Sequence, residues 1–381
     1  MNTRVINAIK KGFIAKFKSE PVLIFSPGRI NIIGEHTDYN DGFVMPAAVD
    51  KGIVAGIQKS NSNVSTVYAM DKDEVFKFSL HNLKILPNGS WQNYILGVVA
   101  EILKKNIALE NFNFAFGGNI PSGAGMSSSA ALENSLVFGL NEVFNLALSK
   151  KEMIVISLRA EHNYVGVKCG IMDQYASMFG IKNNALLLDC RTLEAKAFEI
   201  DFKAYEFILI NTNVKHSLSD TAYNERRFVC ETAAKLMNIT TLRDASLNKL
   251  ETIKNKICLE DYQKVLFVLQ ENNRVLLASK AIAARDLAAL GKLMYASHEG
   301  LQHQYKVSCD ELDFLVHQAK LNPDILGARM MGGGFGGCTI NLIAKSATKA
   351  FKTKITEVYK SKFQTDCSIY TVKLSHGTHM I

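Results

Sequence analysis

Apolar and polar positions divide the chain into a strand-rich first part and a helix-rich second part. Apolar runs typical of strands lie at residues 22–25, 43–46, 52–57, 64–69, 112–117 and 185–188. Apolar residues at helical spacing predict helices over residues 91–103, 127–144 and 151–167. Residues 5–17 repeat the same spacing among lysines, which predicts an amphipathic helix docked on its own domain.

The later pattern changes in kind. A strand at 207–210 is followed by predicted helices at 220–236, 261–277 and 281–297, and then by a strand–helix–strand set at 339–343, 348–359 and 368–373. Strands and helices segregate rather than alternate strictly, so we predict an α+β protein. Composition shifts near residues 190–205, and the length allows two domains, which we place at residues 1–200 and 201–381.

Composition narrows the class of protein. Of 381 residues, 48% are hydrophobic and 21% charged, which is ordinary for a globular chain. The net charge of +8 is spread along the chain, so no nucleic-acid partner is expected. No apolar run approaches the ~20 residues of a membrane-spanning helix, so no membrane partner is expected either. Seven cysteines without a CxxC pair predict a reducing compartment and a cytoplasmic protein.

The segment SPGRINIIGEHTDYN at residues 26–40 concentrates charge after the first predicted strand, which we expect to end at Pro27-Gly28. Carboxylates such as Glu35 and Asp38 accept hydrogen bonds from sugar hydroxyls, and Arg29 carries a charge that does not titrate. The segment is therefore suited to gripping a small, hydroxyl-rich molecule. A polar loop whose charges pair with each other is an equally good interpretation from spacing alone.

A second motif, GGNIPSGAGMSSSAALE at residues 117–133, follows a predicted strand and opens a helix. Gly123 and Gly125 let the backbone approach a ligand, and the first helical turn leaves N–H donors unpaired. These donors, the helix dipole and the three consecutive hydroxyls at residues 127–129 predict a phosphate cradle. An ordinary turn with a serine N-cap is the alternative, but such turns rarely run into Ser-Ser-Ser at a helix start.

Three further features are less specific. The cluster MMGGGFGGC at residues 330–338 contains G-x-G-x-x-G, but a strand pattern follows it, so we interpret it as a turn packed against a loop or a ligand. Asp173 lies among apolar residues, so it is either a base kept ionised by a cation such as Arg29 or a helix N-cap. Glu161 is either a surface acid or a Mg²⁺ ligand. His36 and His162 lack zinc-type partners, so hydrogen-bonding roles are expected.

The order of these motifs, with AYNERR at residues 222–227, resembles that of the GHMP small-molecule kinases, and the first motif resembles the galactokinase signature. The resemblance implies a two-domain fold: an N-terminal mixed-sheet domain and a C-terminal ferredoxin-like α/β sandwich, with the active site between them. It also implies phosphorylation of D-galactose at the C1 hydroxyl by ATP, the first committed step of galactose catabolism in the Leloir pathway. A monomer is expected.

The resemblance assigns roles residue by residue. Asp173 would accept the proton of the C1 hydroxyl, while Arg29 orients it and stabilises developing charge. The residues implied to bind the sugar are Glu35, His36, Thr37, Asp38, Gly170 and Tyr223. The residues implied to wrap the ATP phosphates are Gly123, Ala124, Gly125, Met126, Ser127, Ser128 and Ser129. Ser129 and Glu161 would hold Mg²⁺.

Two alternatives stay open at this stage. The chain could be a kinase for a related sugar, such as N-acetylgalactosamine or L-arabinose, although Thr37 and Asn40 favour galactose. It could also be a non-catalytic sensor of galactose and ATP, although residues 127–130 of the cradle are intact. Met331 stands where the family commonly has threonine, which puts a hydroxyl contact from that position in doubt.

Overall fold

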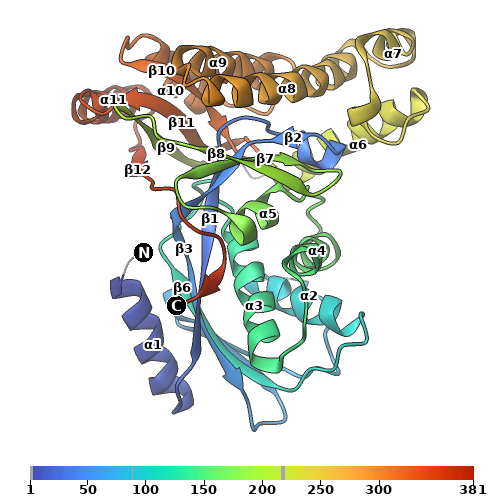
Figure 1. Ribbon diagram of the computed structural model, residues 1–381, viewed down its shortest axis with the longest axis vertical. Helices are drawn as coiled ribbons and strands as arrows, with labels where there is room; N and C mark the ends of the chain where they lie inside the picture. Colours follow the sequence, from blue (N-terminus) through green and yellow to red (C-terminus); the bar gives the residue numbers. More distant parts are fainter. Residues whose placement is uncertain (1–2, 88, 216–218) are drawn as a thin grey trace.

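A computed structural model describes residues 3–87, 89–215 and 219–381 (Figure 1). It confirms the α+β class. Strands of the first part form a six-stranded mixed sheet in the order β13-β1-β3-β6-β4-β5, in which only β4 and β6 run parallel. The bounds are β1 Val22–Asn31, β3 Pro46–Lys59, β4 Ser65–Ala69, β5 Glu74–Phe78, β6 Phe112–Gly118 and β13 His379–Met380.

Helices cover both faces of this sheet (Figure 1). The amphipathic helix α1 (Thr3–Phe17) packs its Ile9 against Phe25 and Val54 on one face. The opposite face carries α2 (Trp91–Leu103), α3 (Ser128–Phe144), α4 (Lys150–Ala160) and α5 (Met172–Phe179). Their apolar residues form the largest core cluster with β3 and β6. A capping box between Ser149 and Glu152 begins α4, because each side chain satisfies a backbone N–H of the other residue.

A second sheet is antiparallel, in the order β10-β11-β9-β12. Its strands are β9 Tyr205–Lys215, β10 Ile325–Met331, β11 Gly336–Ala344 and β12 Ser368–Thr371. The helices of this half are α6 Ser219–Leu236, α7 Leu247–Glu251, α8 Leu259–Ala283, α9 Leu287–His303, α10 Asp310–Lys320 and α11 Thr348–Phe363. One face packs against α10 and α11.

The other face of the second sheet joins the two halves. Leu209 and Ile340 lie in one buried cluster with Ile30 of β1 and Ala47 of β3, so the halves share a core. A small third sheet, β2-β7-β8 (Phe43–Val44, Asn184–Asp189 and Glu194–Glu199), lies at this junction (Figure 1). The last strand, β13, returns to pair with β1. The division at residues 200 and 201 stays a prediction.

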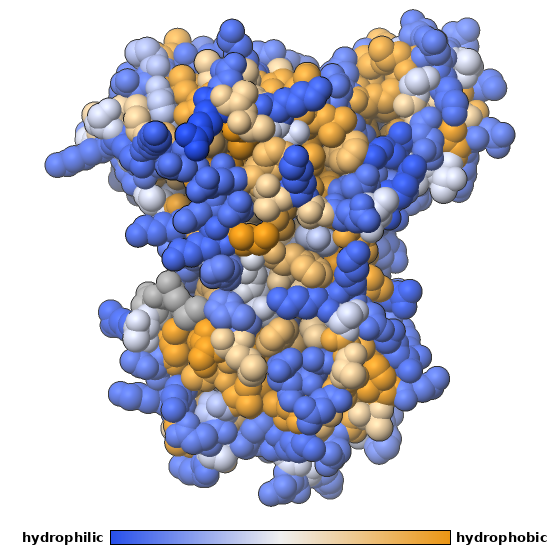
Figure 2. All heavy atoms as spheres, viewed as in Figure 1, coloured by the Kyte–Doolittle hydropathy of each residue, from blue (hydrophilic) through white to orange (hydrophobic). Residues whose placement is uncertain are grey.

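The surface seen in Figure 2 is hydrophilic over most of its area, with apolar side chains gathered in patches between the charged ones. Within the described ranges, no helix combines the length and the apolar character needed to cross a membrane.

Three boundary predictions need correction. The first strand does not end at Pro27-Gly28: β1 continues to Asn31, because a register shift against β3 between Pro27 and Arg29 absorbs the proline. The helices predicted at 261–277 and 281–297 correspond to α8 and α9, but α8 continues to Ala283 and α9 begins at Leu287. The side chain of Asp286 caps α9 by accepting a hydrogen bond from the Ala289 N–H. The predicted helix over 151–167 ends as a π-helical turn at Glu161–Val165.

Candidate active site

The site is organised around an arginine that projects from the bulge in β1. Arg29 is 4% exposed, and its Nε and Nη2 donate to Asp173 Oδ1 and Oδ2 at 2.8 and 3.0 Å. Its Nη1 also donates to the Gly125 carbonyl. Burial alone would lower the pKa of Arg29, but the carboxylates of Asp173 and Glu35 raise it overall, so the guanidinium stays charged.

The partner carboxylate belongs to the first turn of α5. The residue before that helix is Ile171, so Asp173 is not an N-cap, and the alternative raised above is wrong. Asp173 Oδ2 additionally accepts the hydroxyl hydrogen of Ser127. Strand β1, helix α5 and the start of α3 therefore meet at one carboxylate, which lines a cavity.

The glycine–serine loop (residues 121–129) lies against β1. Met126 O accepts from Arg29 N at 3.1 Å, and a Cβ at Gly28 would lie 2.5 Å from that carbonyl, so only glycine fits there. Ala124 and Met126 are buried in the shared core, where Met331 lies beside them. Gly123 and Ser128 are exposed, while Gly125, Ser127 and Ser129 are partly exposed.

Backbone geometry suits this loop to an anion. Gly123 and Gly125 have φ of +69° and +63°, and Ser127, directly before α3, has φ of 56°. The loop thus turns sharply into the N-terminus of a 17-residue helix, whose first N–H groups lack intrahelical acceptors.

The 34–43 loop supplies the acidic side of the cavity. Glu35 Oε1 accepts from Arg329 Nη2 at 2.9 Å and from Gly332 N at 2.8 Å, while no described residue donates to Oε2. Burial, and then the charges of Asp173 and Glu35, raise the pKa of Asp38 to about 7. A Cβ at Gly170 would lie 2.2 Å from the Asp38 carboxyl, so the close approach of these two segments requires glycine.

Other residues of the 34–43 loop hold its shape. The Thr37 hydroxyl lies 2.7 Å from the Phe43 carbonyl oxygen and 3.0 Å from that of Gly34, and Thr37 is fully buried away from the cavity. Asn40 Nδ2 donates to the His36 carbonyl at 3.0 Å. The two residues that favoured galactose therefore act on the loop, and any effect on a sugar passes through its conformation.

The cavity has a volume of about 140 Å³ and brings most of the predicted sugar-binding and catalytic residues together. Its lining comprises Arg29, Glu35, His36, Asp38, Glu161, Val167, Cys169, Met172, Asp173, Tyr223, Gly332 and Gly333. Arginine and carboxylates face a small polar space beside the glycine–serine loop, so the second interpretation of residues 26–40, a loop that only pairs its own charges, does not describe this geometry.

The predicted cation position lies where the cavity meets α3. Glu161 Oε2 accepts from Gln174 Nε2 at 2.6 Å, and a hydrogen bond from Ser129 stabilises the Glu161 carboxylate. Burial nevertheless raises the pKa of Glu161. Across the described part of the chain, no cluster of three or more histidine, cysteine or acidic residues could hold a metal alone. One carboxylate and one hydroxyl suit Mg²⁺, which usually completes its shell with phosphates and water.

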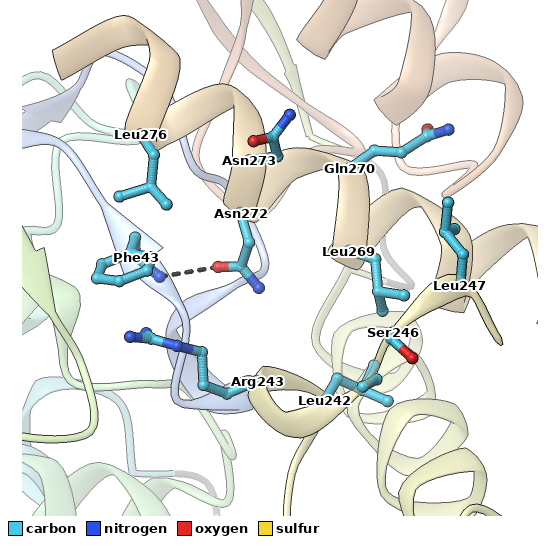
Figure 3. Close-up of a pocket in the computed structure, with 11 residues that line it drawn as sticks. Phe43, Leu242, Arg243, Ser246, Leu247, Leu269, Gln270, Asn272, Asn273 and Leu276 are labelled. Atoms are coloured by element: carbon cyan, nitrogen blue, oxygen red, sulfur yellow. Dashed lines mark hydrogen bonds between the residues drawn. The ribbon is translucent and has the colours of Figure 1, made fainter. Parts of the chain in front are cut away.

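A second cavity, of about 420 Å³, lies behind the 34–43 loop (Figure 3). Leu242, Leu269 and Leu276 form apolar walls between α8 and residues 242–247. At one end, Asn272 Oδ1 accepts from Phe43 N at 2.8 Å, and the Arg243 guanidinium carbon lies 3.6 Å from the centroid of the Phe43 ring. None of the predicted site residues lines this cavity, whose walls instead support the loop from outside.

Comparison with known proteins agrees with this geometry. Family models match the galactokinase galactose-binding signature over residues 11–59, the GHMP kinase N-terminal domain over 93–181 and the GHMP kinase C-terminal domain over 278–361. Galactokinase of Thermosipho africanus is 39% identical over 93% of this chain and 99% of its own length. The chain belongs to the galactokinase family. Galactokinase of Clostridium tetani is also 39% identical to this galactokinase-family member, over all of this chain and 99% of the Clostridium protein.

Solved structures place this family member in the GHMP kinase fold. The crystal structure of Lactococcus lactis galactokinase complexed with galactose superposes with a TM-score of 0.95 at 32% identity, covering 99% of this chain and all of that one. Methanococcus jannaschii mevalonate kinase, at 17% identity, has a TM-score of 0.68 over 94% of this chain and shares the fold.

Several residues of the site were not predicted. Arg329, which holds Glu35, lies one residue before the Met330–Cys338 glycine cluster, and its charge at the end of an apolar strand was a usable signal. Tyr39 and Tyr305, behind His36, had no local signal, because the contact between them joins residues 266 positions apart.

Proposed function

We propose that the chain transfers the γ-phosphoryl group of ATP to the C1 hydroxyl of D-galactose, giving galactose 1-phosphate and ADP. The observation that carries this proposal is the Arg29–Asp173 pair at the point where the glycine–serine loop meets the acidic cavity. Membership of the galactokinase family supports galactose as the acceptor and ATP as the donor.

The geometry favours one division of labour. Glu35 Oε2 and Asp38 are available to sugar hydroxyls, with Gly170 and Tyr223 beside them. The loop at Gly123–Ser129 would hold the phosphates through its backbone N–H groups and serine hydroxyls. Asp173 would take the proton from the C1 hydroxyl as its oxygen bonds to the γ-phosphorus. The bond from that phosphorus to the β–γ bridging oxygen breaks, and ADP leaves.

Arg29 has two tasks in this scheme. Its bidentate contact fixes the Asp173 carboxylate toward the acceptor, and its charge stabilises the negative charge that develops on the transferred group. Ser129 and Glu161 would hold Mg²⁺, which neutralises phosphate charge when bound. Phosphoryl transfer needs mainly positioning and electrostatic stabilisation, and both are supplied by side chains that are already paired. We further propose that the enzyme is cytoplasmic and monomeric, and size-exclusion chromatography checks the oligomeric state.

A coupled ADP-release assay tests the reaction across galactose, N-acetylgalactosamine, L-arabinose, glucose and mevalonate. We expect turnover with galactose. Turnover with another acceptor and none with galactose would overturn the assigned substrate, and galactose binding without any turnover would indicate a sensor.

Asp173→Asn tests the assigned base. We expect kcat to fall by about 10²–10⁴-fold, because proton transfer by a positioned side chain contributes that much. The galactose dissociation constant should change far less, since the amide keeps a similar shape. Full kcat in Asp173→Asn contradicts the assignment.

A further inference from the structure

A chain of hydrogen bonds runs from the second half of the protein to the cavity through His36. Tyr305 Oη lies 2.7 Å from Tyr39 Oη, which lies 2.9 Å from His36 Nδ1. His36 Nε2 lies 3.2 Å from the Gly333 carbonyl oxygen. Cys230 Sγ, 3.4 Å from Tyr305 Oη, forms the far end. Both ring nitrogens of His36 are therefore engaged within the protein, although its ring lines the cavity.

The protons of this chain can point in only one direction. A carbonyl oxygen cannot donate, so His36 Nε2 carries a hydrogen and donates it to Gly333. Burial lowers the pKa of His36 to about 3, so the ring is neutral at physiological pH and Nδ1 is an acceptor. Tyr39 must then donate to Nδ1, and Tyr305 must donate to Tyr39. Each phenol then donates once and accepts once, and the histidine tautomer sets the direction of the hydrogen bonds.

Packing makes the chain rigid. His36, Tyr39 and Tyr305 are 3%, 9% and 0% exposed. The His36 ring lies 4.9 Å from that of Tyr305 and 5.2 Å from that of Tyr223, measured between centroids. Arg226 holds the backbone beside Tyr305 by donating to the carbonyls of residues 305 and 306 at 2.9 Å. The His36 ring is therefore packed against two aromatic rings within a buried cluster.

This chain of hydrogen bonds holds one wall of the cavity. Gly332 N donates to Glu35 and Gly333 O accepts from His36, so two consecutive residues of the 34–43 loop are hydrogen-bonded to two consecutive glycines. Both glycines line the cavity, and Gly332 has φ of +88°. Because glycine has no side chain, packing of side chains cannot hold these two residues in place. The position of this wall depends on its hydrogen bonds.

We propose that Tyr39 and Tyr305 are positioning residues for sugar binding, which act through His36 by holding the Gly333 carbonyl, and with it the glycine wall, against the acceptor. The inference rests on the proposed function, because it takes the cavity as the sugar site. It gives both ring nitrogens of His36 a role within the protein, so the predicted contact of His36 with the sugar would not use them. Neither tyrosine needs to touch the reacting atoms.

Tyr39→Phe and Tyr305→Phe test the proposal, because each removes one hydroxyl and keeps the ring. We expect the galactose KM to rise about 5- to 20-fold, the effect of one lost buried hydrogen bond. We expect kcat and the ATP KM to stay within about twofold, as for a loss of uniform binding. Tyr359→Phe is the matched control: Tyr359 is fully buried, and its hydroxyl donates to Thr212 O at 2.8 Å in a different core cluster. It should lose similar stability without a change in KM.

A second measurement needs no substrate. ¹⁵N spectra of the histidine rings, with the His36 signals assigned by their loss in His36→Gln, should show the Nε2–H tautomer in the wild type and in Tyr305→Phe. Tyr39→Phe should keep this tautomer, which the Gly333 carbonyl requires, but should shift the Nδ1 signal, because nothing then donates to Nδ1. An Nδ1–H tautomer in the wild type, or KM values in both site variants equal to that of Tyr359→Phe, would overturn the proposal. Absence of galactose turnover in the wild type counts against the proposed function alone, because the tautomer still reports on the chain.

Discussion

The carboxylates of the cavity have different partners. Asp173 is paired with Arg29 and Glu35 with Arg329, whereas no ion pair between described residues includes Asp38. Asp38 is 8% exposed and lies near two other carboxylates. Its raised pKa follows from this arrangement: the negative charge is costly where burial is nearly complete and the carboxylates of Asp173 and Glu35 lie nearby.

This arrangement predicts a pH dependence of stability. Folding raises the pKa of Asp38 from 3.8 to about 7, so between these values the folded protein keeps a proton that the unfolded chain releases. The free energy of unfolding should therefore fall as the pH rises through this window. Asp38→Asn cannot titrate, so from pH 5 to pH 8 it should gain on the order of 2–3 kcal/mol relative to wild type.

Urea unfolding of the sugar-free protein at several pH values measures this gain. The exposed Asp201→Asn serves as control and should run parallel to wild type. A constant difference between Asp38→Asn and wild type across the window contradicts the assigned pKa.

At the scale of elements, the 34–43 loop is held by one helix. Consecutive residues of α8 accept from both ends of the loop: Glu271 Oε1 from Gly34 N at 3.0 Å, and Asn272 Oδ1 from Phe43 N at 2.8 Å. Glu271 is fully buried and is also bonded to Ser297 of α9. Helix α8 thus fixes both ends of the loop from outside the cavity that the loop lines.

Asn272→Ala should loosen the loop without touching the site. It leaves the partly buried Phe43 N–H without its acceptor, which costs about 1–3 kcal/mol. We expect lower stability and a higher galactose KM. Asn273→Ala is the matched control, because its side chain is exposed and turned away from Phe43 (Figure 3). Thermal unfolding and initial rates measure both variants, and equal KM values in the two would rule out control of the loop by α8.

Elements with a strong local pattern could be predicted from the sequence. The helix predicted at 91–103 is confirmed as Trp91–Leu103. The prediction was accurate because the apolar face and the polar stretch after it both lie within one short segment. The boundary between α8 and α9 was predicted a few residues too early, because apolar residues continue through the turn, and Arg285, with φ of 56°, is not a residue type that signals a turn. The same holds for the site. The loop motifs could be predicted from local sequence, but the contact between Arg329 and Glu35 could not, because 294 positions separate the two residues.

At the scale of the molecule, Arg329 joins the two halves. It projects from β10 of the second sheet, is fully buried, and donates to the carbonyls of Asn31 and Ile32 in the first half as well as to Glu35. An arginine with this many acceptors fixes the orientation of the halves around the cavity between them.

Arg329→Met should therefore be severe. Removing one partner leaves the Glu35 carboxylate buried and unpaired, which costs about 3–5 kcal/mol. The galactose KM should rise as well, because Glu35 loses its orientation. Arg191→Met, which removes an exposed ion pair with Asp244, should cost less than about 1 kcal/mol. Urea unfolding compares the two, and similar losses would mean that the buried pair does not link the halves.

The return of β13 to β1 has a consequence for how the protein is made. Ile24 and Phe25 pair with the last strand, and Thr378, 1% exposed, lies 2.9 Å from the Ser26 hydroxyl and donates to Ser177 O. During synthesis, the first sheet emerges from the ribosome long before residues 378–380 exist. A nascent chain therefore carries an unpaired edge at β1, the kind of surface on which strands of other chains add. Residues 379–380 cover this edge once they are made, so ribosome-stalled chains that lack them should be more prone to aggregation than chains that include them.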